Sequence, residues 1–313
     1  MAQSKPLNQV FSYLSWVHAV SGATGSVIAM SAFYPLDTVR SRLQLEEPER
    51  RKALSTWEVL KQLIAEEGFN TLYRGIVPVL QSLCISNFVY FYTFHSMKAL
   101  RAAADVTPSA LSDLLLGSLA GVVNVFSTTP FWVVNTRLKM KGLGHRVKDN
   151  STHYDNLLDG LMYIGRTEGA KGLWAGALPS LLLVTNPAIQ FMVYESLKRR
   201  LLADGGRNVS SVTFFAIGAV AKAVATVLTY PLQVIQTKLR HGNTDKSLDL
   251  PPDTDMLQML LVMLKKQGLA GLFRGLEAKL LQTVLTAALM FMTYEKIARF
   301  VTTLLVRGSG PRK

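Results

Sequence analysis

Apolar residues gather in six long segments that alternate with polar stretches along the chain. The segments cover about residues 12–43, 76–100, 109–139, 177–201, 211–239 and 276–304. Each exceeds the roughly 20 residues that a helix needs to cross the apolar layer of a membrane. Several segments also carry scattered polar side chains, which favours a bundle around a polar interior over six separate anchors. We therefore predict an all-α membrane protein with six transmembrane helices.

Three shorter segments lie between the members of each pair of apolar segments, at about residues 54–67, 154–168 and 253–266. In the second of these, Leu157, Leu161 and Ile164 recur at helical spacing, which predicts one apolar face. Such helices are expected to lie flat at the membrane surface. An even number of crossings predicts that both termini lie on one side and the short helices on the other.

A common sequence pattern recurs three times at intervals of about 100 residues, which is typical of a repeat protein. The copies begin at Pro35, Pro130 and Pro231, which lie 95 and 101 residues apart. Each proline falls within an odd-numbered apolar segment, where it is expected to kink the helix and narrow one end of the bundle. The predicted organisation is a tail at 1–11, repeats at 12–104, 105–205 and 206–304, and a tail at 305–313.

Composition narrows the class of protein further. Of 313 residues, 49% are hydrophobic and 18% are charged, and the formal net charge is +13. The charge fits either nucleic-acid binding or basic loops together with a site for anions. No basic arm or aromatic RNA-binding motif is present, so we expect no nucleic-acid partner. Cys84 is the only cysteine and the five histidines are dispersed, which predicts no internal disulfide and no metal site. We also find no catalytic constellation, and expect a protein that is not an enzyme.

The three copies share Pro-x-acid-x-x-base, then acid-Gly, then aromatic-base-Gly, with substitutions in the second and third copies. The tripled pattern resembles the mitochondrial carrier family over about residues 12–304. The stretches 87–94, 129–139 and 275–289 resemble the peroxisomal branch of that family. This resemblance implies a monomeric solute carrier with three repeats around a pseudo-threefold axis.

The same resemblance carries expectations about cargo and location. The cargo would be adenine-containing cofactors, namely coenzyme A, FAD, NAD and AMP, ADP or ATP, with no prosthetic group. The location would be the peroxisomal membrane, with multiple spans and both termini cytosolic. Expected partners are these small molecules, membrane lipid and a peroxisomal membrane-protein import receptor. The alternatives are a mitochondrial inner-membrane carrier for another anion and a non-transporting membrane scaffold.

In the family, the acid and base after each kinking proline form ion pairs that close the matrix side. The resemblance implies three pairs here: Asp37 with Asn135, Trp132 with Gln236, and Gln233 with Arg40. Gln44 lies below the first pair, and we expect it to brace that pair from beneath. None of the three is a full salt bridge. Two can be charge-assisted hydrogen bonds, and Asp37 can also pair with Arg40 on its own helix. We therefore hypothesise a matrix gate with a low barrier to opening.

The even-numbered spans of the family carry a second ring of ion pairs on the cytosolic side. The residues that match it here are Lys98, Glu195, Lys198 and Glu295. Only Glu295 with Lys98 is a complete pair in the family's order. His95 stands opposite Lys198, and Glu195 lacks a basic partner.

Two lysines within the apolar segments are candidates for binding phosphates. Lys222 lies in a run of small and apolar residues, and Lys279 follows Gly275 by four. Point charges on flexible stems suit a moving anion. The alternatives are snorkelling of Lys279 to the interface and an ion pair of Lys222 with Glu277 or Asp113.

The family's substrate contact points map by resemblance to Ser82 on the second span, Leu182 and Leu183 on the fourth, and Gln282 or Thr283 on the sixth. The apolar pair on the fourth span resembles nucleotide carriers, because carriers of amino acids and keto acids place an arginine there. Asn186 and Gln190 are candidates for hydrogen bonds to an adenine edge, and Tyr90 for stacking on it.

Overall fold

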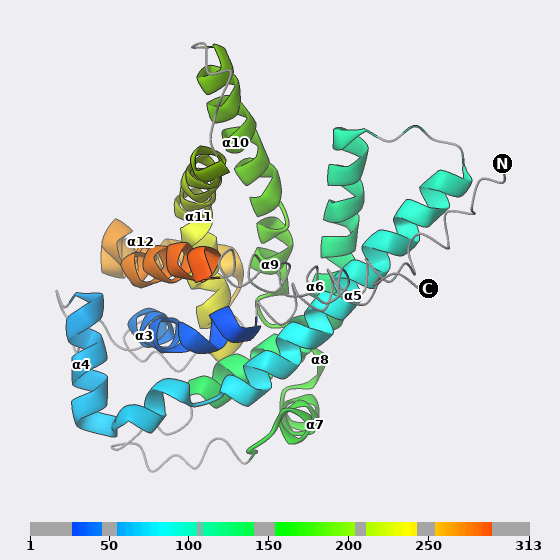
Figure 1. Cartoon of the computed structure of the whole chain (residues 1–313). Helices are drawn as coiled ribbons and strands as arrows, with labels where there is room; N and C mark the ends of the chain where they lie inside the picture. Colours follow the sequence, from blue (N-terminus) through cyan, green and yellow to red (C-terminus); the bar gives the residue numbers. More distant parts are fainter. Residues whose placement is uncertain are drawn as a thin grey trace, which may run out of the picture.

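The computed structural model describes residues 27–45, 55–104, 107, 109–140, 154–203, 211–242 and 254–289. Every regular element in these ranges is helical (Figure 1). After a short helical stretch at 27–32, the order is α3 (Tyr34–Leu45), α4 (Thr56–Glu67), the 3₁₀ helix η2 (Phe69–Tyr73), α5 (Ile76–Ala103), α6 (Ala110–Met140), α7 (Leu157–Thr167), α8 (Gly169–Leu173), α9 (Ala177–Leu183), α10 (Asn186–Ala203), α11 (Ser211–His241), α12 (Met256–Leu272) and a helix at Leu276–Leu289.

Four of the described stretches are long and apolar enough to cross a membrane: Phe69–Ala102, Leu111–Met140, Gly169–Ala203 and Thr213–His241. A fifth is formed by α12 and Leu276–Leu289 if this pair, bent by 46°, counts as one span. The bend lies where the surface helix gives way to the sixth predicted span. Much of the first predicted span lies outside the described residues. The prediction of an all-α membrane protein is confirmed.

The three prolines of the repeat affect their helices differently. The helix before Pro35 stops at Phe33, whose carbonyl accepts a bond from Leu36 N–H at 3.1 Å. Pro130 and Pro231 instead lie inside α6 and α11, which continue through them. The fourth span has a break that we did not predict, between α9 and α10. It precedes Pro187, which has no N–H and disfavours the helical conformation of the residue before it.

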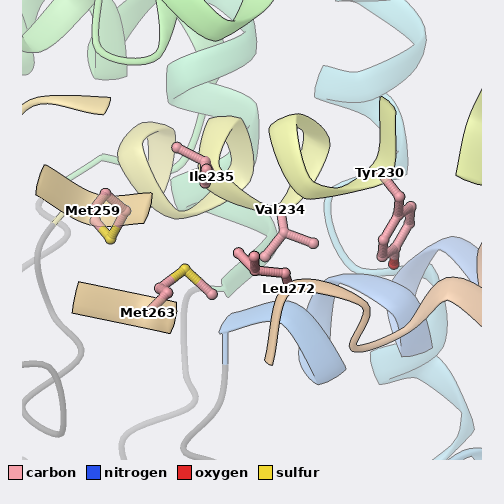
Figure 2. Packing of buried hydrophobic residues seen from close by; sticks show 6 residues of the cluster. All are labelled: Tyr230, Val234, Ile235, Met259, Met263 and Leu272. Atoms are coloured by element: carbon pink, nitrogen blue, oxygen red, sulfur yellow. The ribbon is translucent and has the colours of Figure 1, made fainter. Parts of the chain in front are cut away.

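In each repeat, a surface helix packs against the part of the odd-numbered span that follows the proline. Three apolar clusters do this: Val39 and Leu43 with Val59 and Leu63; Val134 and Leu138 with Leu157 and Ile164; and Val234 and Ile235 with Met259 and Met263. Figure 2 shows the third cluster, in which methionines of α12 face α11. The predicted surface helices are therefore present, and their apolar faces are buried against the bundle.

Side-chain bonds fix the ends of these surface helices. Ser55 forms a capping box with Glu58 at the start of α4, and the Asn156 side chain accepts from Asp159 N–H at the start of α7. Capping of this kind satisfies N–H groups that have no partner within the helix. At the other end of α4, Arg42 Nη2 donates to Glu67 Oε2 at 2.9 Å, which ties α4 to α3.

The closing glycine of each repeat lies against the odd-numbered span of the next repeat. A Cβ on Gly75 would lie 3.3 Å from Lys139 Cα in α6, and one on Gly176 would lie 3.0 Å from Gln236 O in α11. A Cβ on Gly275 would lie 3.3 Å from Arg40 O in α3, so the third repeat closes onto the first. All three glycines have a φ between 75° and 78°, a region that other residues rarely adopt. The three repeats therefore join head to tail in a ring at this end of the bundle, which we call the Asp37 end.

Candidate functional site

The carboxylate of Asp37 lies at the centre of the contacts at the Asp37 end. Helix α3 places Asp37, Arg40 and Gln44 on one face because they are three and seven residues apart. Asp37 Oδ1 lies 3.3 Å from Arg40 Nη2, and Asp37 Oδ2 pairs with Lys139 Nζ of α6. The Lys139 ammonium also lies 4.9 Å from the centroid of the Tyr34 ring. The carboxylate thus has a cation on its own helix and another on the neighbouring repeat.

Two of the three expected cross-helix pairs, Asp37 with Asn135 and Gln233 with Arg40, are not formed in the described structure. Asn135 Nδ2 donates to Ser82 Oγ of α5 at 2.5 Å. Lys139 lies beside Asp37, in the place that we expected Asn135 to occupy. A full positive charge on a long stem outcompetes a neutral amide for a buried carboxylate. The expected pairing of Asp37 with Asn135 was therefore wrong.

The other two amides also find serine or threonine partners. Gln236 Nε2 donates to Ser180 Oγ of α9 at 2.7 Å. Gln233 Nε2 donates to Thr229 Oγ1 on its own helix at 3.2 Å, while Arg40 pairs with Asp37. The expected pairing of Gln233 with Arg40 was wrong as well, because this amide bonds a hydroxyl on its own helix and Arg40 pairs with Asp37. Packing of Trp132 against Gln236 stays a prediction.

Gln44 braces a different helix from the one expected. Its Nε2 donates to Tyr230 Oη of α11 at 3.0 Å, and Tyr230 Oη donates to Arg274 O at 2.8 Å. Tyr34 makes the equivalent bond to Arg74 O at 3.0 Å. The buried Gln44 therefore joins the first repeat to the third, whereas we expected it to support the Asp37 pair from beneath.

At the opposite end of the bundle, the residues of the expected second ring pair within one helix or with the next helix along the chain. Lys98 Nζ lies 3.7 Å from Asp113 Oδ2, and Glu195 lies 3.5 Å from Lys198 on its own helix. Lys198 thus pairs with Glu195, where the family's order places it opposite His95. The predicted partner of Lys98, Glu295, lies outside the described residues.

A cavity of about 400 Å³ lies between α5, α6, α9, α10 and α11. Tyr90 and Leu183, both predicted contact residues, line it, and so do Trp132, Gln236 and Arg240. The Arg240 guanidinium donates to Ser180 Oγ at 3.1 Å and has Arg40 as an electrostatic neighbour. The cavity therefore combines aromatic and apolar walls with cationic and amide groups toward the Asp37 end.

The other predicted contact residues do not line this cavity. Ser82 is fully buried and bonded to Asn135, and Leu182 is 41% exposed. Asn186 Nδ2 donates to Thr229 Oγ1 at 2.8 Å, and Thr283 Oγ1 donates to the Lys279 carbonyl at 2.7 Å. Two further predicted residues, Gln190 on α10 and the buried Gln282, also stay outside it.

The two predicted lysines belong to a group of cations near Asp37. Electrostatic neighbours of Lys279 include Arg40, Asp37, Lys222 and Lys139. Within the described ranges, neither the Lys222 nor the Lys279 ammonium forms an ion pair or hydrogen bond. The acids weighed as partners for Lys222 are engaged elsewhere. Arg40, Lys139 and Lys279 thus face the Asp37 carboxylate, and Lys222 is a neighbour of Lys279.

Those two acids bond to groups remote from Lys222. Asp113 Oδ1 accepts from Arg101 Nη1 at 2.7 Å, and Glu277 Oε2 accepts from Thr56 N–H at 3.3 Å. The alternative of an ion pair for Lys222 with either acid is therefore wrong. Among the described residues, no group of three or more His, Cys, Asp and Glu side chains is arranged to hold a metal ion.

Sequence reasoning missed three residues of this region, namely Lys139, Ser180 and Arg240. A signal for two of them was present, because Lys139 and Arg240 follow their prolines by nine residues, as Gln44 follows Pro35. Comparing that position across the repeats would have drawn attention to both cations. Ser180 had no such signal, since its role depends on the amide of Gln236.

The repeat architecture agrees with a comparison against known families. A family model described as mitochondrial carrier protein matches residues 12–103, 106–205 and 207–304. The chain belongs to the mitochondrial carrier family. The resemblance found in the sequence is therefore confirmed. This family consists of membrane transporters, which are not enzymes.

Three relatives illustrate where the chain falls within the family. Peroxisomal membrane protein PMP34 of Mus musculus is 51% identical over 300 residues, which cover 95% of this chain and 96% of that protein. The peroxisomal nicotinamide adenine dinucleotide carrier of Arabidopsis thaliana is 32% identical, with 94% and 98% covered. Nicotinamide adenine dinucleotide transporter 2, mitochondrial, of the same plant is 31% identical, with 94% and 83% covered. The relatives thus include peroxisomal and mitochondrial proteins.

Proposed function

We propose that this protein exchanges adenine-containing cofactors across the peroxisomal membrane by alternating access. The cargo class comprises coenzyme A, FAD, NAD and the adenine nucleotides AMP, ADP and ATP. The observation that carries this proposal is the group of cations Arg40, Lys139 and Lys279 around Asp37, with Lys222 beside Lys279. An excess of cations in a membrane-embedded site favours an anion with several charges, such as a pyrophosphate.

The cavity supports the same class of cargo. Its walls include Tyr90 and Trp132, whose rings can stack on a base, and Leu183 from the fourth span. Arg240 on the cavity wall lies within electrostatic range of Arg40, so a ligand with a flat apolar part and an anionic part finds both environments in sequence. A small keto acid would use only the cationic part.

Relatives support the location and the solute. One is named as a peroxisomal membrane protein and another as a peroxisomal carrier of nicotinamide adenine dinucleotide. We infer that this is a multi-pass peroxisomal protein that works as a monomer and has both termini in the cytosol. We also infer that a peroxisomal membrane-protein import receptor delivers it. A mitochondrial relative keeps the inner mitochondrial membrane as the alternative.

Uptake by liposomes that contain the purified full chain tests the transport proposal. The liposomes are preloaded with AMP and offered labelled coenzyme A, FAD, NAD, ATP or a keto acid. We expect uptake of the cofactors, and a loss of at least about tenfold in a Lys222→Ala, Lys279→Ala double variant, because each cation stabilises the bound phosphates by more than 1 kcal/mol. The exposed Lys265 of α12 provides the matched control, since Lys265→Ala also removes a positive charge.

Four results would contradict parts of this proposal. Uptake of the keto acid alone would overturn the cargo class. Cofactor uptake unchanged in the double variant would remove both lysines from the transport path. No uptake of any compound by folded protein would favour a membrane scaffold, and a mitochondrial signal in fractionated cells would overturn the location.

A further inference from the structure

Among the described residues, one ion pair at the Asp37 end joins two odd-numbered spans. Asp37 of α3 pairs with Lys139 of α6, whereas its second partner, Arg40, lies on α3 itself. Elsewhere at this end, Arg42 and Arg137 pair with Glu67 and Glu168 beside the surface helices. Across the described ranges, the Asp37–Lys139 pair is therefore the ionic contact that joins two odd-numbered spans.

Asn135 does not compete with Lys139 for this role. Its Nδ2 is committed to Ser82 Oγ, and its Oδ1 is buried without a hydrogen-bond partner. Lys139 follows Asn135 by four residues, one helical turn closer to the end of α6. Its long stem reaches back so that the ammonium lies beside Asp37 and above the Tyr34 ring. Both Asp37 and Lys139 are less than one-tenth exposed.

We propose that Lys139 is a positioning residue that holds the Asp37 end closed, in place of a base at Asn135. The charged contact of the second repeat is thus displaced by one helical turn along α6. Opening separates α6 from α3, which breaks the pair with Lys139 while Asp37 keeps Arg40 at 3.3 Å on its own helix. The carboxylate is then never left without a cation, which lowers the cost of opening.

This inference rests on alternating access in the proposed function, but not on the identity of the cargo. Its test therefore measures the closure of the Asp37 end without transport. Ser41 shares the α3 face of Asp37 and Gln44, is buried, and bonds only to the carbonyl of Asp37 on its own helix. A cysteine at this position, in a Cys84→Ser background, reports opening through its rate of alkylation by a charged maleimide in detergent-solubilised full-length protein.

We expect Lys139→Met to raise the alkylation rate at least about tenfold, since it removes the buried ionic contact that joins α6 to α3. Asp37→Asn should raise it similarly, and the two substitutions together should add little, because they break the same contact. Lys139→Arg keeps the charge and should stay near the parent rate. Asn135→Ala leaves the ion pair intact and should have little effect.

Two results would overturn the proposal. One is a parent-like alkylation rate in Lys139→Met. The other is a rise in Asn135→Ala that equals the rise expected for Lys139→Met, and this result decides the matter even if Lys139→Met fails to fold. The outcome is independent of the cargo proposal, because a carrier of any solute must close this end to expose the other.

Discussion

The hydroxyl of Tyr230 joins the third repeat to the first through its bond with Gln44 and also bonds Arg274 within the third repeat, so its removal gives a sharp prediction. It accepts from Gln44 Nε2 at 3.0 Å and donates to Arg274 O at 2.8 Å, and both Gln44 and Tyr230 are buried. In Tyr230→Phe, the amide and the carbonyl both lose a partner. Each buried group left unsatisfied costs about 1–3 kcal/mol, which gives a total of about 2–4 kcal/mol after partial relaxation.

Tyr34→Phe is the matched control, because Tyr34 precedes Pro35 as Tyr230 precedes Pro231 and makes only the bond to Arg74 O. We expect it to cost about 1–2 kcal/mol. Thermal unfolding of the purified protein should therefore show a Tm lowered by about 3–6 °C in Tyr230→Phe and by about half as much in Tyr34→Phe. Both variants keep their rings, so the cation–π contact of Lys139 with the Tyr34 ring persists.

A second substitution separates the hydrogen-bond effect from general damage. Gln44→Met on the Tyr230→Phe background removes the unsatisfied amide and should recover part of the lost stability, because replacing both partners by apolar groups is far less costly than removing one. Equal Tm losses in Tyr230→Phe and Tyr34→Phe, or no recovery on adding Gln44→Met, would refute the reasoning.

Two further predictions concern helix contacts. Trp132→Asp combined with Gln236→Arg would add an ion pair between α6 and α11 and should slow exchange in liposomes; a faster double variant would contradict a low barrier at the Asp37 end. Gly121→Ala should destabilise the protein by about 1–3 kcal/mol in thermal unfolding, because its Cβ would lie 2.9 Å from Val184 Cγ1. Gly218→Ala has open space around it and should be tolerated, so equal losses would count against close packing at Gly121.

The periodic features of the fold could be read from the sequence. The apolar face of residues 154–168 predicted a surface helix, and α7 buries Leu157 and Ile164 against α6. The recurring glycines predicted equivalent positions, and all three closing glycines lie in the same backbone conformation. These features succeed because they depend on local spacing and on one residue type.

The partners at the Asp37 end could not be predicted in this way. The family's order assigns Asn135, Gln236 and Gln233 to the opposite spans, but amides are short, uncharged and able to bond any hydroxyl nearby. Which hydroxyl is near depends on helix packing, which the sequence pattern does not contain. For Lys139, the position in the repeat could be read from the sequence, but its pairing with Asp37 could not.

The head-to-tail contacts of the closing glycines bear on how the protein can be made. Gly75 lies against α6, Gly176 against α11, and Gly275 against α3 as well as Tyr230 of its own repeat, so each closing glycine needs a neighbour from another repeat. During synthesis, the first repeat must wait for the second, and α3 lacks its last neighbour until the third repeat emerges. The ring is thus completed only after nearly the whole chain has left the ribosome. A truncated product would present unfilled helix faces to the membrane, where quality control can recognise them.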